Sequence, residues 1–288
     1  MHMPHTIQSL LTHDTAHLTD MLGLDASTAR IEVQCLLQKV LRQPRAWLLA
    51  HPEVKLDTAQ RNEYAALLQR RLTGEPIAYI LGEREFFSLM FKVTPATLIP
   101  RPETELLVEQ ALQRVPPQGC VLDLGTGSGA IALSIAHAQP EVRVLACDAS
   151  SDALAVAHEN IQCLGIHNVT LLQSDWYTAL GAQRFDLIVS NPPYIATHDP
   201  HLLQGDVRFE PVSALTSGED GLCDIRHIIN GALAHLAPGG WLLLEHGYDQ
   251  AQRVRELLQS ASFGEVHSVQ DLAGIERVSG GTAAVNDA

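Results

Sequence analysis

The first 75 residues alternate apolar and polar positions with a helical period. In residues 28–43 the apolar side chains recur close to every 3.6 residues, and Pro44, which cannot continue a helix, follows directly. A second apolar stripe begins after Asp57, a residue type that caps helices, and ends at Gly74. β-Branched runs are scarce here. The pattern predicts a small helical bundle over residues 1–75.

The character of the chain changes after Ala78. Residues 85–93 are short, aromatic and strand-like, which predicts a hairpin that links two domains. Residues 98–105 contain two prolines and precede a helix that ends near Arg114; either Glu103 or Thr104 could begin it.

From Gly119 onward, apolar strands and helices alternate. We expect strands over 121–124, 142–147, 169–172, 185–190 and 241–244, with weaker ones near 265–270 and 275–278. Helices are expected over 129–138, 151–163, 222–236 and 250–260, and a frayed tail after Val278. This alternation predicts a parallel sheet covered on both faces, with ligands bound at the carboxyl ends of its strands.

Charge sharpens this division of the chain. Of its 288 residues, 33 are acidic and 19 basic, giving a formal net charge of −14. Residues 1–80 carry eight of each sign, so residues 81–288 hold the whole excess. Such a chain is a poor candidate for non-specific duplex binding, and 46% hydrophobic residues exclude a disordered chain. We expect no membrane span and no secretory signal.

The five cysteines are widely spaced and form no Cys-x-x-Cys pair. Neither a disulfide framework nor a zinc site is expected, and a reducing cytoplasm fits best. His13 and His17 lie four residues apart, but no third metal ligand accompanies them, so we expect no metal.

The N-terminal segment is made locally basic by five arginines: Arg42, Arg45, Arg61, Arg70 and Arg71. They are a candidate docking surface, although helix faces often carry such charges.

A glycine-rich turn joins the first predicted strand of the sheet to the next helix. It reads Asp123-Leu124-Gly125-Thr126-Gly127-Ser128-Gly129, a Gly-x-Gly-x-Gly pattern with an acid two residues before it. Glycines let the backbone turn sharply and approach a ligand closely. A phosphate-binding P-loop would need Gly-Lys-Ser/Thr, which is absent.

Acidic residues end the next two strands. Asp148 could bind a ribose diol, and Asp175 could accept a hydrogen bond from an exocyclic amine beside the indole of Trp176. The glycine turn followed by these acids at three successive strand ends resembles the class I S-adenosylmethionine-dependent methyltransferases, an α/β Rossmann-like fold. The resemblance implies that Asp123 lies near the methionine part of the cofactor.

The strand over 185–190 leads into Asn191-Pro192-Pro193-Tyr194. Asn191 offers an amide oxygen, the prolines offer carbonyls without N–H groups, and Tyr194 could stack on a planar group. Acceptors that face one pocket suit a planar NH₂ group such as a carboxamide or an exocyclic base amine. Since the lone pair of such a nitrogen is delocalised, orientation toward a methyl donor would supply much of the catalysis.

This tetrapeptide resembles that of methyltransferases acting on adenine-N6 or glutamine-N5. Nearly the whole chain is similar to the HemK/PrmC family, the protein-(glutamine-N5) methyltransferases of peptide chain release factors. The matching stretches are Ile99–Glu105, Asp123–Gly129, Ser190–Ile195, Phe209–Pro211, Ala214–Leu215 and Leu243–Gly247. Glu103 stands where the family often has Asp.

The resemblance implies a substrate, the Gln of the Gly-Gly-Gln loop in bacterial class 1 release factors. Asn191 and the Pro192 carbonyl would hold its amide, with Pro193 and Tyr194 beside it, and Arg101 and Glu105 would shape the acceptor pocket. The cofactor S-adenosylmethionine would lie against Asp123, Gly125, Thr126, Gly127, Ser128, Gly129, Asp148, Asp175, Trp176 and Asn191. The implied organisation is a helical docking domain over 1–80, a hairpin linker over 81–100 and a catalytic domain over 101–288.

Three other functions compete with this interpretation. A ribosomal-protein glutamine methyltransferase would share the chemistry. A DNA adenine-N6 methyltransferase would also share it but needs a basic duplex-binding surface, whereas residues 81–288 carry −14. A non-catalytic adaptor that binds S-adenosylmethionine would have no use for residues 191–194. We expect no direct nucleic-acid or membrane partner.

Overall fold

The computed structural model describes residues 6–285, and within them the chain divides into two compact units. The first, which we call the helical unit, comprises the chain up to Gly82 together with Leu203–Phe209. The second, the sheet unit, comprises Glu83–Leu202 and the chain from Glu210 onward. The segment Leu203–Phe209 thus belongs to the helical unit, although the residues before and after it in the sequence belong to the sheet unit.

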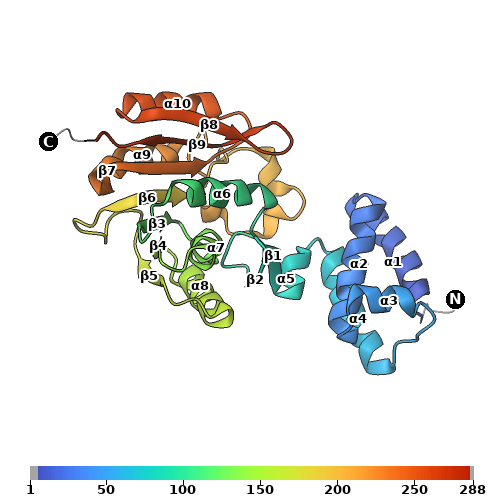
Figure 1. Ribbon diagram of the computed structural model, residues 1–288. Helices are drawn as coiled ribbons and strands as arrows, with labels where there is room; N and C mark the ends of the chain where they lie inside the picture. Colours follow the sequence, from blue (N-terminus) through green and yellow to red (C-terminus); the bar gives the residue numbers. More distant parts are fainter. Residues whose placement is uncertain (1–5, 286–288) are drawn as a thin grey trace. The chain divides into compact units, whose positions relative to one another are not determined.

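Five helices form the helical unit (Figure 1): α1 Ile7–Leu22, α2 Ala26–Leu41, α3 Arg45–Ala50, α4 Thr58–Leu72 and α5 Ile77–Leu81. The Asp57 side chain accepts a hydrogen bond from the Gln60 N–H and caps α4. The apolar faces of α1, α2 and α4 meet in one core that includes Leu11, Leu36 and Tyr64. The helical bundle predicted from the apolar period is therefore confirmed, with α2 beginning two residues before the predicted start.

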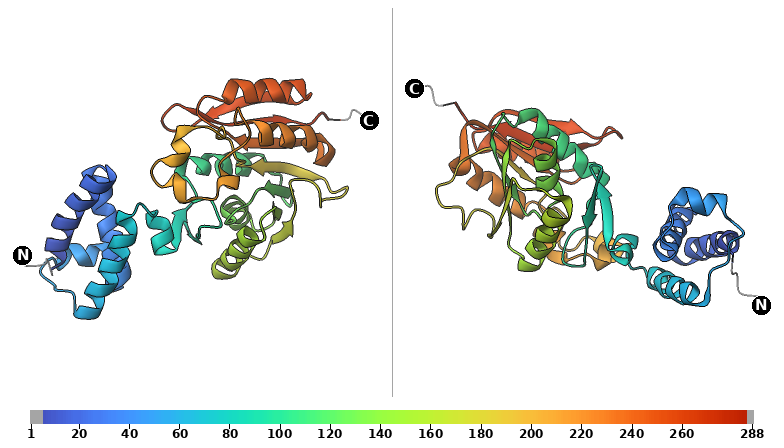
Figure 2. Two further views of the ribbon diagram at one scale, coloured as in Figure 1. Left: turned by 180° about the vertical axis from the view of Figure 1, so that it is seen from behind. Right: turned by 60° about the horizontal axis from the view of Figure 1, so that its bottom comes forward.

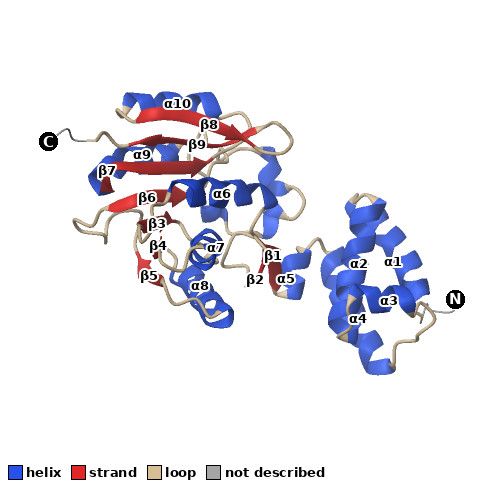
Figure 3. Cartoon of the chain, viewed as in Figure 1, coloured by secondary structure: helices blue, strands red, loops and turns tan. Residues whose placement is uncertain are grey.

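The sheet unit begins with an antiparallel hairpin, β1 Glu83–Phe86 and β2 Leu89–Lys92. Its other strands are β3 Cys120–Leu124, β4 Arg143–Asp148, β5 Val169–Gln173, β6 Phe185–Ser190, β7 Leu236–Glu245, β8 Gly264–Gln270 and β9 Glu276–Thr282. Its helices are α6 Glu105–Arg114, α7 Ala130–Ala138, α8 Ser151–Leu164, α9 Cys223–His235 and α10 Ala251–Ser260, with 3₁₀ turns at Pro102–Thr104 and Val212–Ala214. Figure 3 shows how strands and helices alternate through this unit.

Seven strands form one sheet in the order β5-β4-β3-β6-β7-β9-β8. The first five of these are mutually parallel, but β9 is antiparallel to both β7 and β8. The predicted all-parallel sheet is therefore wrong at this edge, because the short β8–β9 connection can join only antiparallel strands. The predicted fraying after Val278 is also wrong: β9 continues to Thr282, and Ser279 is fully buried.

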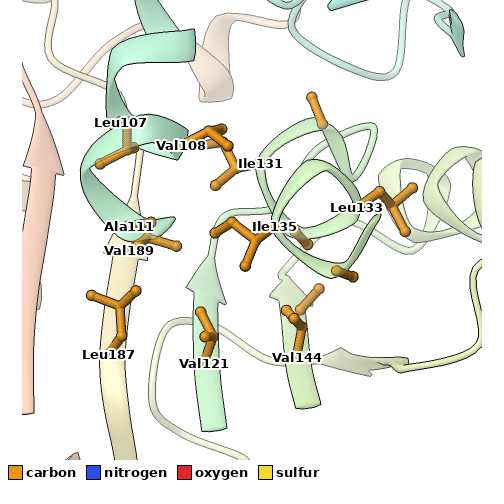
Figure 4. Packing of buried hydrophobic residues seen from close by; sticks show 14 of the residues in the cluster. Leu107, Val108, Ala111, Val121, Ile131, Leu133, Ile135, Val144, Leu187 and Val189 are labelled. Atoms are coloured by element: carbon orange, nitrogen blue, oxygen red, sulfur yellow. The ribbon is translucent and has the colours of Figure 1, made fainter. Parts of the chain in front are cut away.

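Both faces of the sheet are covered, as the continuous apolar strands predicted (Figure 2). The α9 and α10 helices pack on one face through residues that include Ile228 and Val254. On the other face, Figure 4 shows Val108 of α6 and Ile135 of α7 above Val121 of β3. Successive strand residues point to opposite faces, so both cores are built from the same strands.

The strand order creates a reversal between β3 and β6. The chain passes from β3 outward to β4 and β5, and returns to pair β6 with the other side of β3. Leu124 and Ser190, the last residues of β3 and β6, are paired in register. The loops that follow these two strands therefore begin side by side, at the position where sheets of this kind bind ligands.

Candidate active site

A pocket of about 470 Å³ lies at these strand ends, within the sheet unit. Its lining includes seven of the residues that the sequence singled out: Gly125, Gly127, Asp148, Asp175, Trp176, Asn191 and Pro193. Residues 96–98 and part of the segment 211–214 also line it. The structure therefore brings two residues of the glycine turn, the two acids and two residues of the acceptor tetrapeptide into one cavity of the size that small-molecule sites have.

The glycine turn follows β3 and depends on left-handed backbone geometry. The φ angles of Gly125, Gly127 and Gly129 are +73°, +57° and +85°, a region that side chains with a Cβ rarely adopt. A Cβ on Gly125 would lie 3.6 Å from the Trp176 ring, so this ring passes close to the backbone of the turn.

Asp148 joins the end of β4 to the glycine turn. Its Oδ2 accepts the Gly127 N–H at 2.9 Å, and its Oδ1 accepts the Ser150 N–H at 2.9 Å. A carboxylate of the protein therefore takes a backbone donor that a phosphate would use in a dinucleotide site. This arrangement disfavours a phosphate-bearing ligand at the turn.

The charge of the pocket has a single sign. Asp148, Asp152, Asp175 and Asp224 line it, and no Lys, Arg or His is among its lining residues in the described chain. Anionic walls suit a cation and repel a nucleotide phosphate. Together with the Trp176 ring and the close backbone of the glycine turn, they fit a cationic nucleoside such as a sulfonium.

Asp123 is wholly buried beneath the turn and is not among the residues that line the pocket. Its Oδ2 accepts a hydrogen bond from the Thr126 hydroxyl at 2.6 Å, and its Oδ1 has no hydrogen-bond partner in the described residues. Burial raises the pKa of Asp123 to about 7, against the opposing effect of the Thr126 hydrogen bond. Thr126 and Ser128 are likewise buried and shape the turn from behind.

The tetrapeptide 191–194 follows β6 and forms the other side of the pocket. The Asn191 Nδ2 donates to the Thr104 Oγ1 at 3.2 Å, which leaves the buried Asn191 Oδ1 without a partner in residues 6–285. Pro192 is buried, while Pro193 is half-buried and lines the pocket. A buried acceptor without a donor indicates a ligand that supplies one.

Tyr194 contacts the end of β7 instead of lining the pocket. Its hydroxyl donates to Glu245 Oε1 at 3.4 Å, and its backbone oxygen accepts from Gln250 Nε2 at 3.0 Å. The Tyr194 ring packs against the core that α9 and α10 cover, and burial raises its pKa well above the usual range for tyrosine.

Arg101 and Glu105 also lie outside the pocket lining. Arg101 forms an ion pair with the buried Glu210, which in addition accepts the Ile99 N–H at 3.0 Å. Glu105 accepts the N–H of Phe87 at 2.9 Å and so fixes the hairpin. Arg101 is therefore placed to hold the segments 96–101 and 210–214 together, whereas Glu105 contacts the β1–β2 turn.

Sequence reasoning missed four side chains that organise the site. Thr104 was interpreted only as a helix start and Glu245 was given no role, although both fall in stretches that carried the family resemblance. Glu210 lies in another such stretch. Asn160 gave no signal at all: its Nδ2 donates to the Ser128 oxygen at 2.8 Å and so fixes the glycine turn from α8.

Two classes of site find no support in the described residues. No group of three or more His, Cys, Asp or Glu side chains in residues 6–285 could hold a metal ion. None of the helices in that same range is long and apolar enough to cross a membrane.

Comparison with known proteins gives matches over both units. The family model described as "Methyltransferase small domain" matches residues 102–206, and that described as "PrmC N-terminal domain" matches residues 16–82. A methyltransferase from Pyrococcus furiosus shares the fold: its crystal structure superposes with a TM-score of 0.55 and 19% identity over 77% of this chain and all of that one.

Full-length relatives are much closer in sequence. The release factor glutamine methyltransferase of Bordetella pertussis is 54% identical over 92% of this chain and 98% of its own length. That of Salmonella typhimurium is 51% identical over 89% and 93%, respectively. The chain therefore belongs to the HemK/PrmC family of release factor glutamine methyltransferases.

Proposed function

We propose that this protein transfers a methyl group from S-adenosylmethionine to the side-chain amide nitrogen of the Gln in the Gly-Gly-Gln loop of class 1 release factors. The observation that carries the proposal is the buried Asn191 Oδ1, which lacks a donor beside the anionic pocket. A primary carboxamide supplies the missing N–H. The names of the relatives point to the same class of substrate.

In this proposal different pocket residues bind different parts of the cofactor. The glycine turn from Gly125 to Gly129 lies against it, Asp148 binds the ribose diol, and Asp175 with Trp176 holds the adenine. The four pocket carboxylates complement a positive charge. When bound, S-adenosylmethionine supplies an electrophilic methyl group on a sulfonium centre.

The acceptor tetrapeptide then orients the substrate nitrogen. Asn191 Oδ1 and the Pro192 carbonyl accept the two amide hydrogens, which turns the face of the nitrogen toward the methyl group. Since both acceptors are fixed before the substrate arrives, orientation is the main contribution of the protein, of order 7–11 kcal/mol at best. The new N–C bond forms as the S–C bond breaks, and the nitrogen releases one proton to water.

Labelled S-adenosylmethionine tests the proposal most directly. We expect label in a class 1 release factor, and none in the same factor with its motif Gln replaced, in ribosomal protein or in unmethylated DNA. Equal labelling of the Gln-replaced factor would contradict the assigned acceptor. Labelling of ribosomal protein instead would favour the related ribosomal-protein enzymes, and labelling of DNA would favour an adenine-N6 activity.

Since all five cysteines are free thiols, we place this reaction in the cytoplasm.

The helical unit is part of the proposal as the docking domain for the release factor body. Arg42 and Arg45 are exposed and could contact a partner. Arg71 is excluded from such a surface, because it is 2% exposed and pairs with Glu32 at 2.7 Å and Asp206 at 3.1 Å. The earlier inclusion of Arg71 among docking arginines is therefore wrong.

Charge reversal at both exposed arginines, Arg42→Glu with Arg45→Glu, tests this docking role. We expect the KM for the intact release factor to rise while kcat stays unchanged, since the residues lie in the other unit from the pocket. A short peptide that carries Gly-Gly-Gln serves as the control, and its KM is expected not to change. An unchanged KM for the intact factor would remove these arginines from the docking surface.

A further inference from the structure

A side chain from the turn after β7 holds the last residue of the acceptor tetrapeptide. Gln250, which immediately precedes α10, is 7% exposed. Its Oε1 accepts the Gly247 N–H at 2.9 Å, and its Nε2 donates to the Tyr194 carbonyl oxygen at 3.0 Å. The sheet register explains this proximity: Ser190 pairs with Leu244, so the loops after β6 and β7 leave neighbouring strands together.

Both partners of the Gln250 amide are backbone groups, and this fixes its orientation. A backbone N–H can only donate and a carbonyl oxygen can only accept, so Oε1 must face Gly247 and Nε2 must face Tyr194. The Gln250 N–H also donates to the Gly247 oxygen at 3.1 Å. The side chain is therefore anchored in its own turn and presents a donor to the tetrapeptide.

Gly221 leaves the space that this contact needs. Its φ is +73°, and a Cβ built there would lie 2.3 Å from the Tyr194 carbonyl oxygen and 2.8 Å from Gln250 Nε2. Both distances are well below van der Waals contact, so a larger residue would push these groups aside. Three segments of the sheet unit thus meet at this one hydrogen bond.

The hydrogen bond fixes a loop that can adapt little. Pro192 and Pro193 have no N–H, and each ring holds φ at about −65°. With two successive φ angles fixed, the loop can absorb little of a displacement at Tyr194. A shift of the Tyr194 carbonyl would therefore also move the Pro192 carbonyl and the neighbouring Asn191 side chain.

We propose that Gln250 is a positioning residue for methyl transfer: by holding the Tyr194 carbonyl, it keeps Asn191 and Pro192 in the orientation that the substrate amide needs. Gln250 is not among the described residues that line the pocket, so it acts through the backbone of the tetrapeptide. This inference rests on the proposed function, which gives the Asn191 oxygen and the Pro192 carbonyl their use.

Gln250→Glu is the sharpest variant, because it keeps the shape of the side chain and removes the donor. One carboxylate oxygen still accepts the Gly247 N–H, but the other faces the Tyr194 carbonyl oxygen, and two acceptors repel. At about pH 8 we expect kcat to fall about 100-fold, as for a misplaced reacting group, with cofactor affinity kept. Gln259→Glu adds the same charge at an exposed residue of α10 and should change neither quantity.

A lower pH should restore the contact in this variant alone. Once protonated, the introduced carboxyl donates to Tyr194 while it still accepts from Gly247. We expect the ratio of the variant kcat to the wild-type kcat to rise at least about tenfold from about pH 8 to about pH 6, because the protonated fraction of an acid above its pKa changes about tenfold per pH unit. Gln250→Met offers no donor and should stay slow throughout, whereas a purely structural defect would give both variants the same pH dependence.

The other titratable groups near this contact are unchanged in these variants. Burial raises the pKa of Glu245 to about 7 and lowers that of His246, and hydrogen bonds from Arg226 hold the pKa of Asp220 well below its usual range. The remaining charged neighbours are Asp249, which precedes Gln250, and Arg253, which pairs with Asp220. Division by the wild-type kcat removes the pH dependence of all of these groups.

Gly221 provides an independent test with a matched control. In Gly221→Ala the new Cβ displaces the Tyr194 carbonyl, so we expect a fall in kcat like that of Gln250→Met. Gly181→Ala is the control: its φ is +60° and nothing lies within 4 Å of a Cβ built there, so it carries the same backbone strain without the clash. The Gly181 variant should keep its kcat.

The outcomes separate this inference from the proposed function. If the wild-type enzyme does not methylate a release factor, the proposed function fails. If the wild type is active and the Glu and Met variants of Gln250 keep its kcat, or lose it equally at every pH, only the positioning role is overturned. If neither variant folds, the glycine pair decides, and equal kcat of the two alanine variants overturns the inference.

Discussion

Each of the two loops that build the pocket contacts a buried carboxyl group, and the two carboxyls are held in different ways. Asp123 lies beneath the glycine turn, and its hydrogen-bond partner Thr126 is three residues away in the same turn. Glu245 lies at the end of β7, and its hydrogen-bond partner is the hydroxyl of Tyr194, 51 residues away in the acceptor tetrapeptide. Burial raises the pKa of both carboxyls to about 7.

This difference shows two ways of preparing a binding loop. The glycine turn takes its shape from its own backbone, which three left-handed glycines and a nearby threonine define. In the acceptor tetrapeptide, the Asn191 amide donates to Thr104, which lies 87 residues away and is brought beside it only by the folded sheet unit. Changes to the turn should therefore act on cofactor binding, and changes to the tetrapeptide should act on transfer.

Asn191→Ala is expected to give the largest difference between the effect on methyl transfer and the effect on cofactor binding. The substitution removes the unpartnered acceptor that would hold the substrate amide, so we expect kcat to fall about 10³-fold. Cofactor affinity should be largely intact, because the glycine turn and Asp148 are untouched. Single-turnover transfer and calorimetric titration with the cofactor measure the two quantities. An equal loss of cofactor affinity would show that the two loops are not separable in this way.

The same contrast explains what the sequence could predict. The glycine turn, Asp148 and the apolar strands are local patterns, and the structure places them where the pattern indicated. The position of β9 between β7 and β8 depends on pairing between strands, which no local pattern encodes. Thr104 was interpreted by its local role at a helix start, but its side chain contacts Asn191, 87 residues away, and caps no backbone N–H.

Arginines gave a similar lesson in the helical unit. Arg70 and Arg71 are adjacent in the sequence and were interpreted together as surface charges. In the structure Arg70 is exposed and pairs with Glu75 at 2.5 Å, whereas Arg71 is buried between Glu32 and Asp206. The partner Asp206 comes from Leu203–Phe209, whose place in the helical unit is a property of the fold alone.

The Asp123 carboxyl beneath the glycine turn is expected to lower the free energy of unfolding once it loses its proton. In the folded protein the pKa of Asp123 is raised from 3.8 to about 7, so the folded state binds the proton more tightly than the unfolded state. Its contribution to the free energy of unfolding is full below about pH 4 and is lost as the pH rises through about 7. Asp123→Asn stays neutral and keeps an acceptor for Thr126, so it escapes this loss.

Urea unfolding of the wild type and Asp123→Asn at several pH values measures this difference. Between pH 4 and pH 8, we expect the free energy of unfolding of the variant to rise relative to that of the wild type by about 3 kcal/mol. Glu245 contributes a loss of the same sign to both proteins, so the difference between them isolates Asp123. A difference that stays constant over the pH range would show that Asp123 is not protonated near neutral pH.

The smallest effect is expected from Gly127→Ala, which changes only the backbone of the turn. The φ of Gly127 is +57° and nothing lies within 4 Å of a Cβ built there, so the cost is strain without a clash. That strain is about 1–2 kcal/mol and should lower cofactor affinity about tenfold if the turn moves to relieve it. Gly127→Asn is the matched control, because Asn tolerates the left-handed region better than Ala. Equal cofactor affinities of the Ala and Asn variants would show that φ at Gly127 does not govern binding. A parallel fall in kcat at saturating cofactor would show that the turn also positions the acceptor amide.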